Sequence, residues 1–172
     1  MSIRVGILTI SDRGYRGEYE DQSGPLIREI VTERLGALVE LESIVPDSQP
    51  LIQSTLTVWC DEMGLDLILC TGGTGFAPRD VTPEATQAVI QRPTPGLVEA
   101  MRAASLKITP HAMLSRAAAG IRGRTLIVNL PGSPKAVREN LEVILPALPH
   151  GLRLLKEVAG ENRRHAPQVR EA

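Results

Sequence analysis

A glycine-rich run, Thr71-Gly72-Gly73-Thr74-Gly75, follows a short apolar segment and is the first candidate for chemistry in this sequence. Glycines let the backbone turn tightly and point its N–H groups at an anion, and the threonine hydroxyls add neutral donors. A tight exit from a buried strand would use the same glycines without a ligand, so both interpretations stay open for the run alone. Two common phosphate motifs do not fit, because a P-loop needs lysine after its last glycine, where Phe76 stands, and a dinucleotide fingerprint needs a third glycine where Pro78 stands.

Two carboxylates, Asp47 and Asp80, are the second candidate. Asp80 follows the glycine run closely, and Asp47 follows a predicted strand over residues 38–45. Each alone is typical of a helix cap or a solvated loop charge. Together beside an anion-binding turn they would repel phosphate unless a cation lay between them, and Mg²⁺ binds carboxylates together with water and phosphate oxygens. The pair therefore predicts a magnesium–nucleotide site with Asp47 and Asp80 as metal ligands, and the structural alternative stays open.

Two further segments carry groups that could bind anions. Ser11-Asp12-Arg13 supplies a hydroxyl, a carboxylate and a guanidinium. Pro131-Gly132-Ser133-Pro134-Lys135 supplies a second glycine turn at a predicted helix start, where free N–H groups favour anions. Ser133 is equally suited to capping that helix, and both roles can hold at once.

Other kinds of catalytic site have little support. His111, His150 and His165 are far apart and show no metal-ligand spacing. Cys60 and Cys70 are too few for a disulfide framework and have no partner motif for nucleophilic catalysis. Covalent catalysis is therefore not expected.

Strand-like and helical segments alternate along the chain. Apolar runs predict strands over residues 3–11, 38–45, 65–71 and 124–130, with a loop over 12–24. Helices are expected from Pro25, Ser48, Thr82, Gly96 and Ser133, and a short one over 115–119 is one interpretation of the ambiguous segment 108–123. This alternation predicts an α/β fold, a mostly parallel sheet with helices on both faces. Ligands bind such sheets beyond the carboxyl ends of the strands, where all the polar segments above are expected.

Length and composition indicate a single globular domain. The 172 residues are 42% hydrophobic and 23% charged, and we expect one domain over residues 1–160 and a polar C-terminal tail over 161–172. A net charge of −1 and 2% aromatic residues argue against a nucleic-acid partner. No apolar stretch reaches the roughly 18–20 residues of a membrane span, and no leader pattern follows Met1, so we expect a cytoplasmic protein without a membrane partner.

In combination, the motifs resemble those of the molybdopterin adenylyltransferases of the MogA type, and those of the similar G domains of gephyrin and of the plant cofactor-assembly protein. The segments that carry the resemblance are 10–13, 71–75, 79–84, 115–123 and 130–135. It covers nearly everything from Ile3 to about Lys156, with no departure at a motif position.

The resemblance implies a three-layer α/β fold, assembled as a homotrimer, that transfers AMP from Mg-ATP to the phosphate of molybdopterin and releases pyrophosphate. It implies that Asp47 and Asp80 match two aspartates required for activity. It places the pterin and phosphates at Thr71, Gly72, Gly73, Thr74, Gly75, Ser11, Asp12 and Ser115, and the nucleotide near Pro131, Gly132 and Ser133. A downstream molybdate-insertion protein would be a further partner.

Two other functions remain as alternatives. A non-catalytic pterin-binding or cofactor-handover protein of the MoaB type would share the fold and the glycine run. A generic nucleotide-binding domain would explain the glycine run but not the remaining motifs. The presence of both Asp47 and Asp80 favours the enzyme, because function follows from the site rather than the fold. The enzyme would need no strong general base, since its phosphate nucleophile is already ionised at neutral pH.

Overall fold

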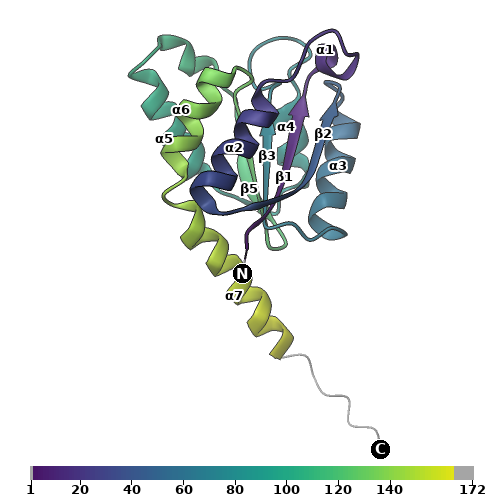
Figure 1. Ribbon diagram of the computed structural model, residues 1–172, viewed down its shortest axis with the longest axis vertical. Coiled ribbons are helices and arrows are strands. Elements are labelled where there is room, and N and C mark those ends of the chain that lie inside the picture. Colours follow the sequence, from purple (N-terminus) through teal and green to yellow (C-terminus); the bar gives the residue numbers. More distant parts are fainter. Residues whose placement is uncertain (1, 165–172) are drawn as a thin grey trace, which may run out of the picture.

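The computed structural model describes residues 2–164, which are built around one six-stranded sheet (Figure 1). The strands are β1 (Arg4–Ile10), β2 (Leu38–Val45), β3 (Leu67–Thr71), β4 (Arg92–Pro93), β5 (Ala119–Arg122) and β6 (Thr125–Leu130). Their order across the sheet is β2-β1-β3-β6-β5-β4. Strands β2, β1, β3 and β6 are parallel, whereas β5 pairs antiparallel with β6 and β4 antiparallel with β5. The predicted α/β fold with a mostly parallel sheet is confirmed.

Helices connect the strands. They are α1 (Asp12–Tyr15), α2 (Ser23–Leu35), α3 (Gln49–Asp61), α4 (Thr82–Val89), α5 (Pro95–Leu106), the 3₁₀ helix η1 (Pro110–Leu114), α6 (Pro134–Ile144) and α7 (Leu148–Arg164). Proline occupies the first turn of α3, α4, α5 and α6, where its missing N–H would have no partner inside the helix. Helix α2 ends at Gly36, whose φ of 58° lies in the left-handed region that glycine adopts readily.

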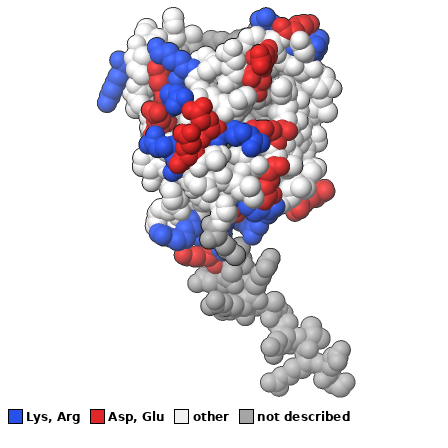
Figure 2. Space-filling model, viewed as in Figure 1, with Lys and Arg blue, Asp and Glu red and all other residues white. Residues whose placement is uncertain are grey.

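Two apolar layers, one on each face of the sheet, hold these helices. Successive residues of a strand point to opposite faces. On β3, Leu67 and Leu69 pack in the same cluster as residues of α2, α5, α6 and α7, whereas Ile68 and Cys70 pack in a second cluster with residues of α3 and α4. Figure 1 views the sheet from the side that α2 and α6 cover, and Figure 2 shows that charged side chains of both signs are scattered over this face. The molecule therefore has three layers, with helices on both faces of the sheet.

The prediction of a short helix over residues 115–119 is wrong. Strand β5 begins at Ala119 instead, and the N–H of Ala118 donates to Oδ1 of Asn129 (3.1 Å), a residue of β6. Gly120 is needed for close packing, because a Cβ there would lie 2.5 Å from Ile90 Cδ1. Alanines favour helices in isolation, but here tertiary pairing with β6 overrides that preference.

The structure also refines two boundaries. The expected loop over 12–24 contains the short helix α1 and the first residues of α2. Helix α7 continues to Arg164, so residues 161–164 of the expected tail are helical, and residues 165–172 lie outside the described residues. Within residues 2–164, the helices are too short or too polar to cross a membrane.

Candidate active site

The carboxyl ends of the four parallel strands meet at one edge of the sheet, where hydrogen bonds join the loops that follow them. The N–H of Ser11 donates to Val45 O (2.9 Å), which joins the exits of β1 and β2. The Thr71 hydroxyl donates to Pro131 O (2.7 Å), which joins the exits of β3 and β6. The structure thus brings together the polar segments that the sequence places at this edge.

The glycine run forms a turn that requires glycine. Gly72 and Gly73 have φ values of 98° and 65°, in the left-handed region. A Cβ on Gly72 would lie 2.3 Å from Ile10 O, and one on Gly73 would lie 2.4 Å from Thr82 Oγ1 and 3.0 Å from Asp47 Oδ1. Thr82 fastens the turn, because its hydroxyl donates to Gly72 O (2.8 Å) and its N–H donates to Gly73 O (3.1 Å). The turn therefore approaches Asp47 more closely than a side chain would permit.

Asp12 and Asp47 hold each other in place. The N–H of Asp12 donates to Asp47 Oδ2 (2.9 Å), and the N–H of Asp47 donates to Asp12 Oδ1 (3.0 Å). Arg79 pairs with both carboxylate oxygens of Asp12 and donates to Asp47 O (3.1 Å). The hydrogen-bonded Arg79 guanidinium holds the pKa of Asp12 below its ordinary value, whereas burial, together with the charges of Asp12 and Asp80, raises the pKa of Asp47. A cation would therefore stabilise the charged form of Asp47.

Asp80 lies beside Gly75, the last residue of the glycine turn. Its Oδ2 accepts the N–H of Ala77 (3.0 Å) and lies 3.0 Å from where a Cβ on Gly75 would stand. Within the described residues, Oδ1 of Asp80 and Oδ1 of Asp47 accept no hydrogen bond, so each aspartate keeps one oxygen for a ligand. No group of three or more His, Cys, Asp or Glu side chains in the described part of the chain could hold a metal ion. A cation between these aspartates would need further ligands, such as phosphate oxygens.

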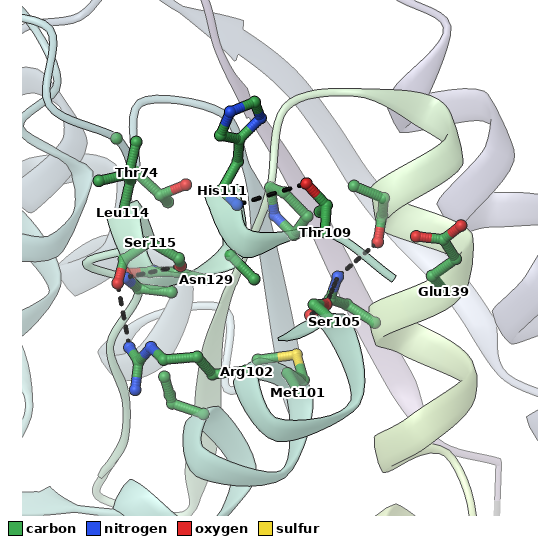
Figure 3. A pocket seen from close by; sticks show the side chains of 17 residues that line it. Thr74, Met101, Arg102, Ser105, Thr109, His111, Leu114, Ser115, Asn129 and Glu139 are labelled. Atoms are coloured by element: carbon green, nitrogen blue, oxygen red, sulfur yellow. Dashed lines mark hydrogen bonds between the residues drawn. The ribbon is translucent and has the colours of Figure 1, made fainter. Parts of the chain in front are cut away.

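A cavity of about 270 Å³ borders the glycine turn (Figure 3). Of the predicted site residues, Thr74, Gly75, Ser115 and Pro131 line it. The rest of the wall comes from Val98, Met101, Arg102, Ser105, Thr109, His111, Ala112, Leu114, Ala117, Asn129, Ala136, Glu139 and Asn140. Most of the exposed surface of the wall is apolar, although seven of these thirteen residues are polar or charged, and an apolar surface with placed polar groups is typical of a small-molecule site.

A second, smaller hollow of about 130 Å³ also borders the glycine turn. Of the predicted residues, Ser11, Thr71, Gly72 and Gly132 line it, beside Thr9, Ile10, Gly14, Tyr19, Asp21 and Ser23. The predicted residues thus divide between two hollows, and Asp12, Asp47, Gly73, Asp80 and Ser133 line neither.

Two predicted hydroxyls serve as helix caps. Ser11 Oγ accepts the N–H of Gly14 (3.0 Å) at the start of α1, and Ser133 Oγ accepts the N–H of Ala136 (3.3 Å) at the start of α6. The capping interpretation of Ser133 is confirmed. Pro134 has no N–H, and the N–H of Val137 donates to Ser133 O (2.9 Å), so in the part of the chain that the structure describes Lys135 alone keeps a free N–H in the first turn of α6.

The sequence indicates no role for Arg79 or Arg116, and it predicts Thr82 only as a helix cap, although all three hold the site together. The cap prediction is wrong, because Val81 is the N-cap residue of α4 and the Thr82 hydroxyl donates to Gly72 O instead. Thr82 fastens the glycine turn, Arg79 pairs with Asp12, and Arg116 donates to the carbonyl oxygens of Gly75 (2.8 Å) and Asp80 (2.7 Å). Their only signal was their place beside Asp80 and Ser115 in the motifs. Nothing in an isolated arginine indicates which distant carbonyls it will bind.

The fold and this edge define an α/β protein with a glycine turn flanked by two aspartates. The chain belongs to the family described as "Probable molybdopterin binding domain", whose model matches residues 6–150. It is 49% identical over 155 residues to the molybdopterin adenylyltransferase of Helicobacter pylori strain J99, covering 90% of this chain and 88% of that protein. It is 47% identical over 147 residues to the Escherichia coli K12 molybdopterin adenylyltransferase, covering 85% and 75%.

A solved structure is similar over the same region. The crystal structure of the molybdopterin biosynthesis enzyme MoaB from Thermus thermophilus superposes with a TM-score of 0.84 at 55% identity, covering 89% of this chain and 96% of that one. The resemblance inferred from the sequence motifs is therefore confirmed.

Proposed function

We propose that this chain is a molybdopterin adenylyltransferase of molybdenum cofactor biosynthesis, which transfers AMP from ATP to the phosphate of molybdopterin and releases pyrophosphate. Curated relatives of this name share nearly half of its residues over most of its length. The observation that carries the proposal is the position of Asp47 beside Gly73 and of Asp80 beside Gly75 in one glycine turn, each with an oxygen that accepts no hydrogen bond within the described residues.

The chain's own residues can meet the demands of this reaction. Two anionic groups must be brought together, and negative charge develops on the leaving pyrophosphate. Glycine-turn N–H groups, together with those of Gly132, Ser133 and Lys135 that follow Pro131 around the start of α6, would bind phosphate oxygens. The cavity beside Thr74 and Ser115 would hold the pterin, with Ser11, Asp12, Thr71 and Gly72 on the phosphate side.

Asp47 and Asp80 suit Mg²⁺ because each presents a free carboxylate oxygen and the pair supplies too few ligands to hold a metal without phosphate. When bound, Mg²⁺ would neutralise charge on the reacting phosphates. The raised pKa of Asp47, caused mainly by burial, supports this role, since a cation would offset the cost of the buried charge.

Pyrophosphate release tests the proposal. Purified protein with molybdopterin, ATP and Mg²⁺ should form adenylated pterin and pyrophosphate in equal amounts. Pterin binding without pyrophosphate release, whichever divalent metal is supplied, would favour the cofactor-handover function instead. The similarity to a protein named MoaB is the reason to test this alternative.

The remaining expectations belong to the same proposal. We expect a homotrimer in the cytoplasm that passes its product to a molybdate-insertion protein. Sedimentation at micromolar concentration tests the trimer, and a monomer there would contradict it.

A further inference from the structure

Arg116 lies between the glycine turn, Asp80 and α4. Its backbone N–H donates to Thr74 O (2.9 Å). Its Nε donates to Gly75 O (2.8 Å), its Nη2 donates to Asp80 O (2.7 Å), and its Nη1 forms an ion pair with Glu84. Every nitrogen of the guanidinium therefore has a partner.

These hydrogen bonds close the loop over residues 76–79. Gly75 and Asp80 are the residues on either side of this loop, and their carbonyl oxygens accept from the same guanidinium. A planar guanidinium fixes two acceptors in a rigid geometry that an ammonium group does not reproduce. The Asp80 carboxylate folds back onto the N–H of Ala77 in the same loop, so its position depends on the shape of that loop.

Glu84 and Ser115 extend the connection to α4 and to the cavity. Glu84 Oε2 is buried without a hydrogen-bond partner in the described part of the chain, so Arg116 is what compensates its charge there. Ser115 precedes Arg116 and lines the 270 Å³ cavity, so the bond from the Arg116 N–H to Thr74 O also fixes the cavity wall against the glycine turn.

We propose that Arg116 is a positioning residue for adenylyl transfer, which sets the Asp80 carboxylate relative to the glycine turn and the cavity. Arg116 does not line the cavity, so it acts through the groups that it holds rather than through contact with the pterin. The inference rests on the proposed function and adds to it a residue outside both hollows.

Arg116→Met, Arg116→Lys and Glu84→Gln test this role, with Arg122→Met as the matched control. Arg122 also pairs with a carboxylate, Asp61 (2.6 Å), and donates to a carbonyl, Val89 O (3.0 Å). Its side chain is 23% exposed against 34% for Arg116. Arg122 lies at the opposite end of β5 from the site, so its loss removes a similar ion pair without touching Asp80.

Arg116→Met should lower kcat about 100-fold, because a misplacement of about 1 Å can cost that much. Pterin affinity, measured by direct titration, should change less than about threefold. Mn²⁺ binding in the presence of a non-hydrolysable ATP analogue, followed by electron paramagnetic resonance, should weaken about tenfold, as when a group that orients a metal ligand is removed. Arg116→Lys should fall between Arg116→Met and wild type, and Glu84→Gln should lose severalfold in kcat.

The control separates positioning from folding. Arg122→Met should lower the melting temperature by a similar amount and leave kcat and Mn²⁺ binding at wild-type values. Equal effects of Arg116→Met and Arg122→Met on kcat, or unchanged Mn²⁺ binding in Arg116→Met, would overturn the inference. If Arg116→Met does not fold, Arg116→Lys decides in the same way, with about tenfold lower kcat expected and wild-type values against the proposal. A wild-type protein that releases no pyrophosphate would instead contradict the proposed function, and Mn²⁺ binding would still test Arg116.

Discussion

Asp12 and Asp47 each accept a hydrogen bond from the backbone N–H of the other, at 3.0 and 2.9 Å. This reciprocal pairing makes the loops after β1 and β2 one unit beside the glycine turn. It also engages the carboxylate of Asp12, which Arg79 binds at the same time. Asp12 remains a proposed substrate-binding residue, but the geometry favours an effect on substrate through the position of Asp47.

The pair predicts opposite effects of two similar substitutions on stability. The pKa of Asp12 is lowered by its hydrogen bond to Arg79, so its charge stabilises the fold above the ordinary pKa of 3.8, and this contribution is lost as pH falls through the lowered value. Asp12→Asn should therefore destabilise the protein at pH 7. The difference from wild type should shrink as pH falls below 3.8 and disappear once Asp12 is protonated in the folded state as well.

Ionisation of Asp47 should have the opposite effect on the free energy of unfolding. Its pKa is raised by burial, so ionisation costs stability at any pH above the raised value, and the cost is absent well below the ordinary value of 3.8. Asp47→Asn keeps an oxygen for the N–H of Asp12 and should be at least as stable as wild type at pH 7 while losing adenylyl transfer. Chemical unfolding of both variants from pH 3 to 8 measures this, and an Asp47→Asn protein that is less stable than wild type at pH 7 would contradict the assignment.

Asp80→Asn should separate chemistry from pterin binding. The asparagine keeps the size of the side chain and an oxygen that can accept from Ala77, but it loses the charge proposed to hold the metal against the triphosphate. That charge matters most in the transition state, so kcat should fall about 100-fold or more, whereas pterin affinity should change little. Steady-state kinetics beside pterin titration provide the measurement, and wild-type turnover would remove Asp80 from the catalytic set.

Much of this arrangement could be predicted from local sequence. The parallel strands, the proline-started helices and the glycine turn each have a local signal, and the rule that ligands bind beyond strand ends then gathers Asp47, Asp80 and the glycines at one edge. The strand that begins at Ala119 could not be predicted in this way, because Ala117, Ala118 and Ala119 favour a helix and only pairing with β6 makes Ala119 the start of a strand.

The residues that hold the site had no comparable signal. Arg116 binds the carbonyl oxygens of Gly75 and Asp80, which lie 41 and 36 positions away in the chain. A carbonyl is present at every residue, so the sequence contains no mark of which one an arginine binds. The division of the predicted residues between two hollows likewise depends on how α5, η1 and α6 pack, which no motif specifies.

Gly73→Ala should damage both the fold and the site. Gly73 has φ of 65°, and its Cβ would lie 2.4 Å from Thr82 Oγ1. The left-handed backbone alone costs about 1–2 kcal/mol, so a total loss of at least about 2 kcal/mol is expected with the clash. Gly96→Ala is the control, because a Cβ there meets nothing within 4 Å and α5 should gain up to about 1 kcal/mol. Urea unfolding compares them, and equal stabilities would show that the turn relaxes at little cost.

Lys156 should anchor α7 to the rest of the domain. In Figure 1 this helix extends away from the sheet and from the other helices. Its Nζ lies 2.8 Å from Asp66 Oδ2, which also accepts the N–H of Arg4 at 2.8 Å. The Asp66 side chain is only 3% exposed and that of Lys156 26%, so removing the lysine leaves a buried charge with less compensation. Breaking a fully buried pair costs about 3–5 kcal/mol, and partial exposure of Lys156 reduces the expected loss in Lys156→Met to about 2 kcal/mol.

Two further variants test whether the loss of stability in Lys156→Met comes from the buried charge of Asp66. Lys135→Met is the surface control, since Lys135 is 80% exposed and its partner Glu139 lies 3.7 Å away, so a change within about 0.5 kcal/mol is expected. Adding Asp66→Asn to Lys156→Met should recover part of the loss, because it removes the unpaired buried charge. Kinetic constants of Lys156→Met and of the double variant should stay at wild-type values, since Asp66 lies just before β3 and the site lies beyond the other end of that strand. If Lys156→Met is as stable as Lys135→Met, the apolar contacts of Leu148 and Leu152 alone hold α7 in place.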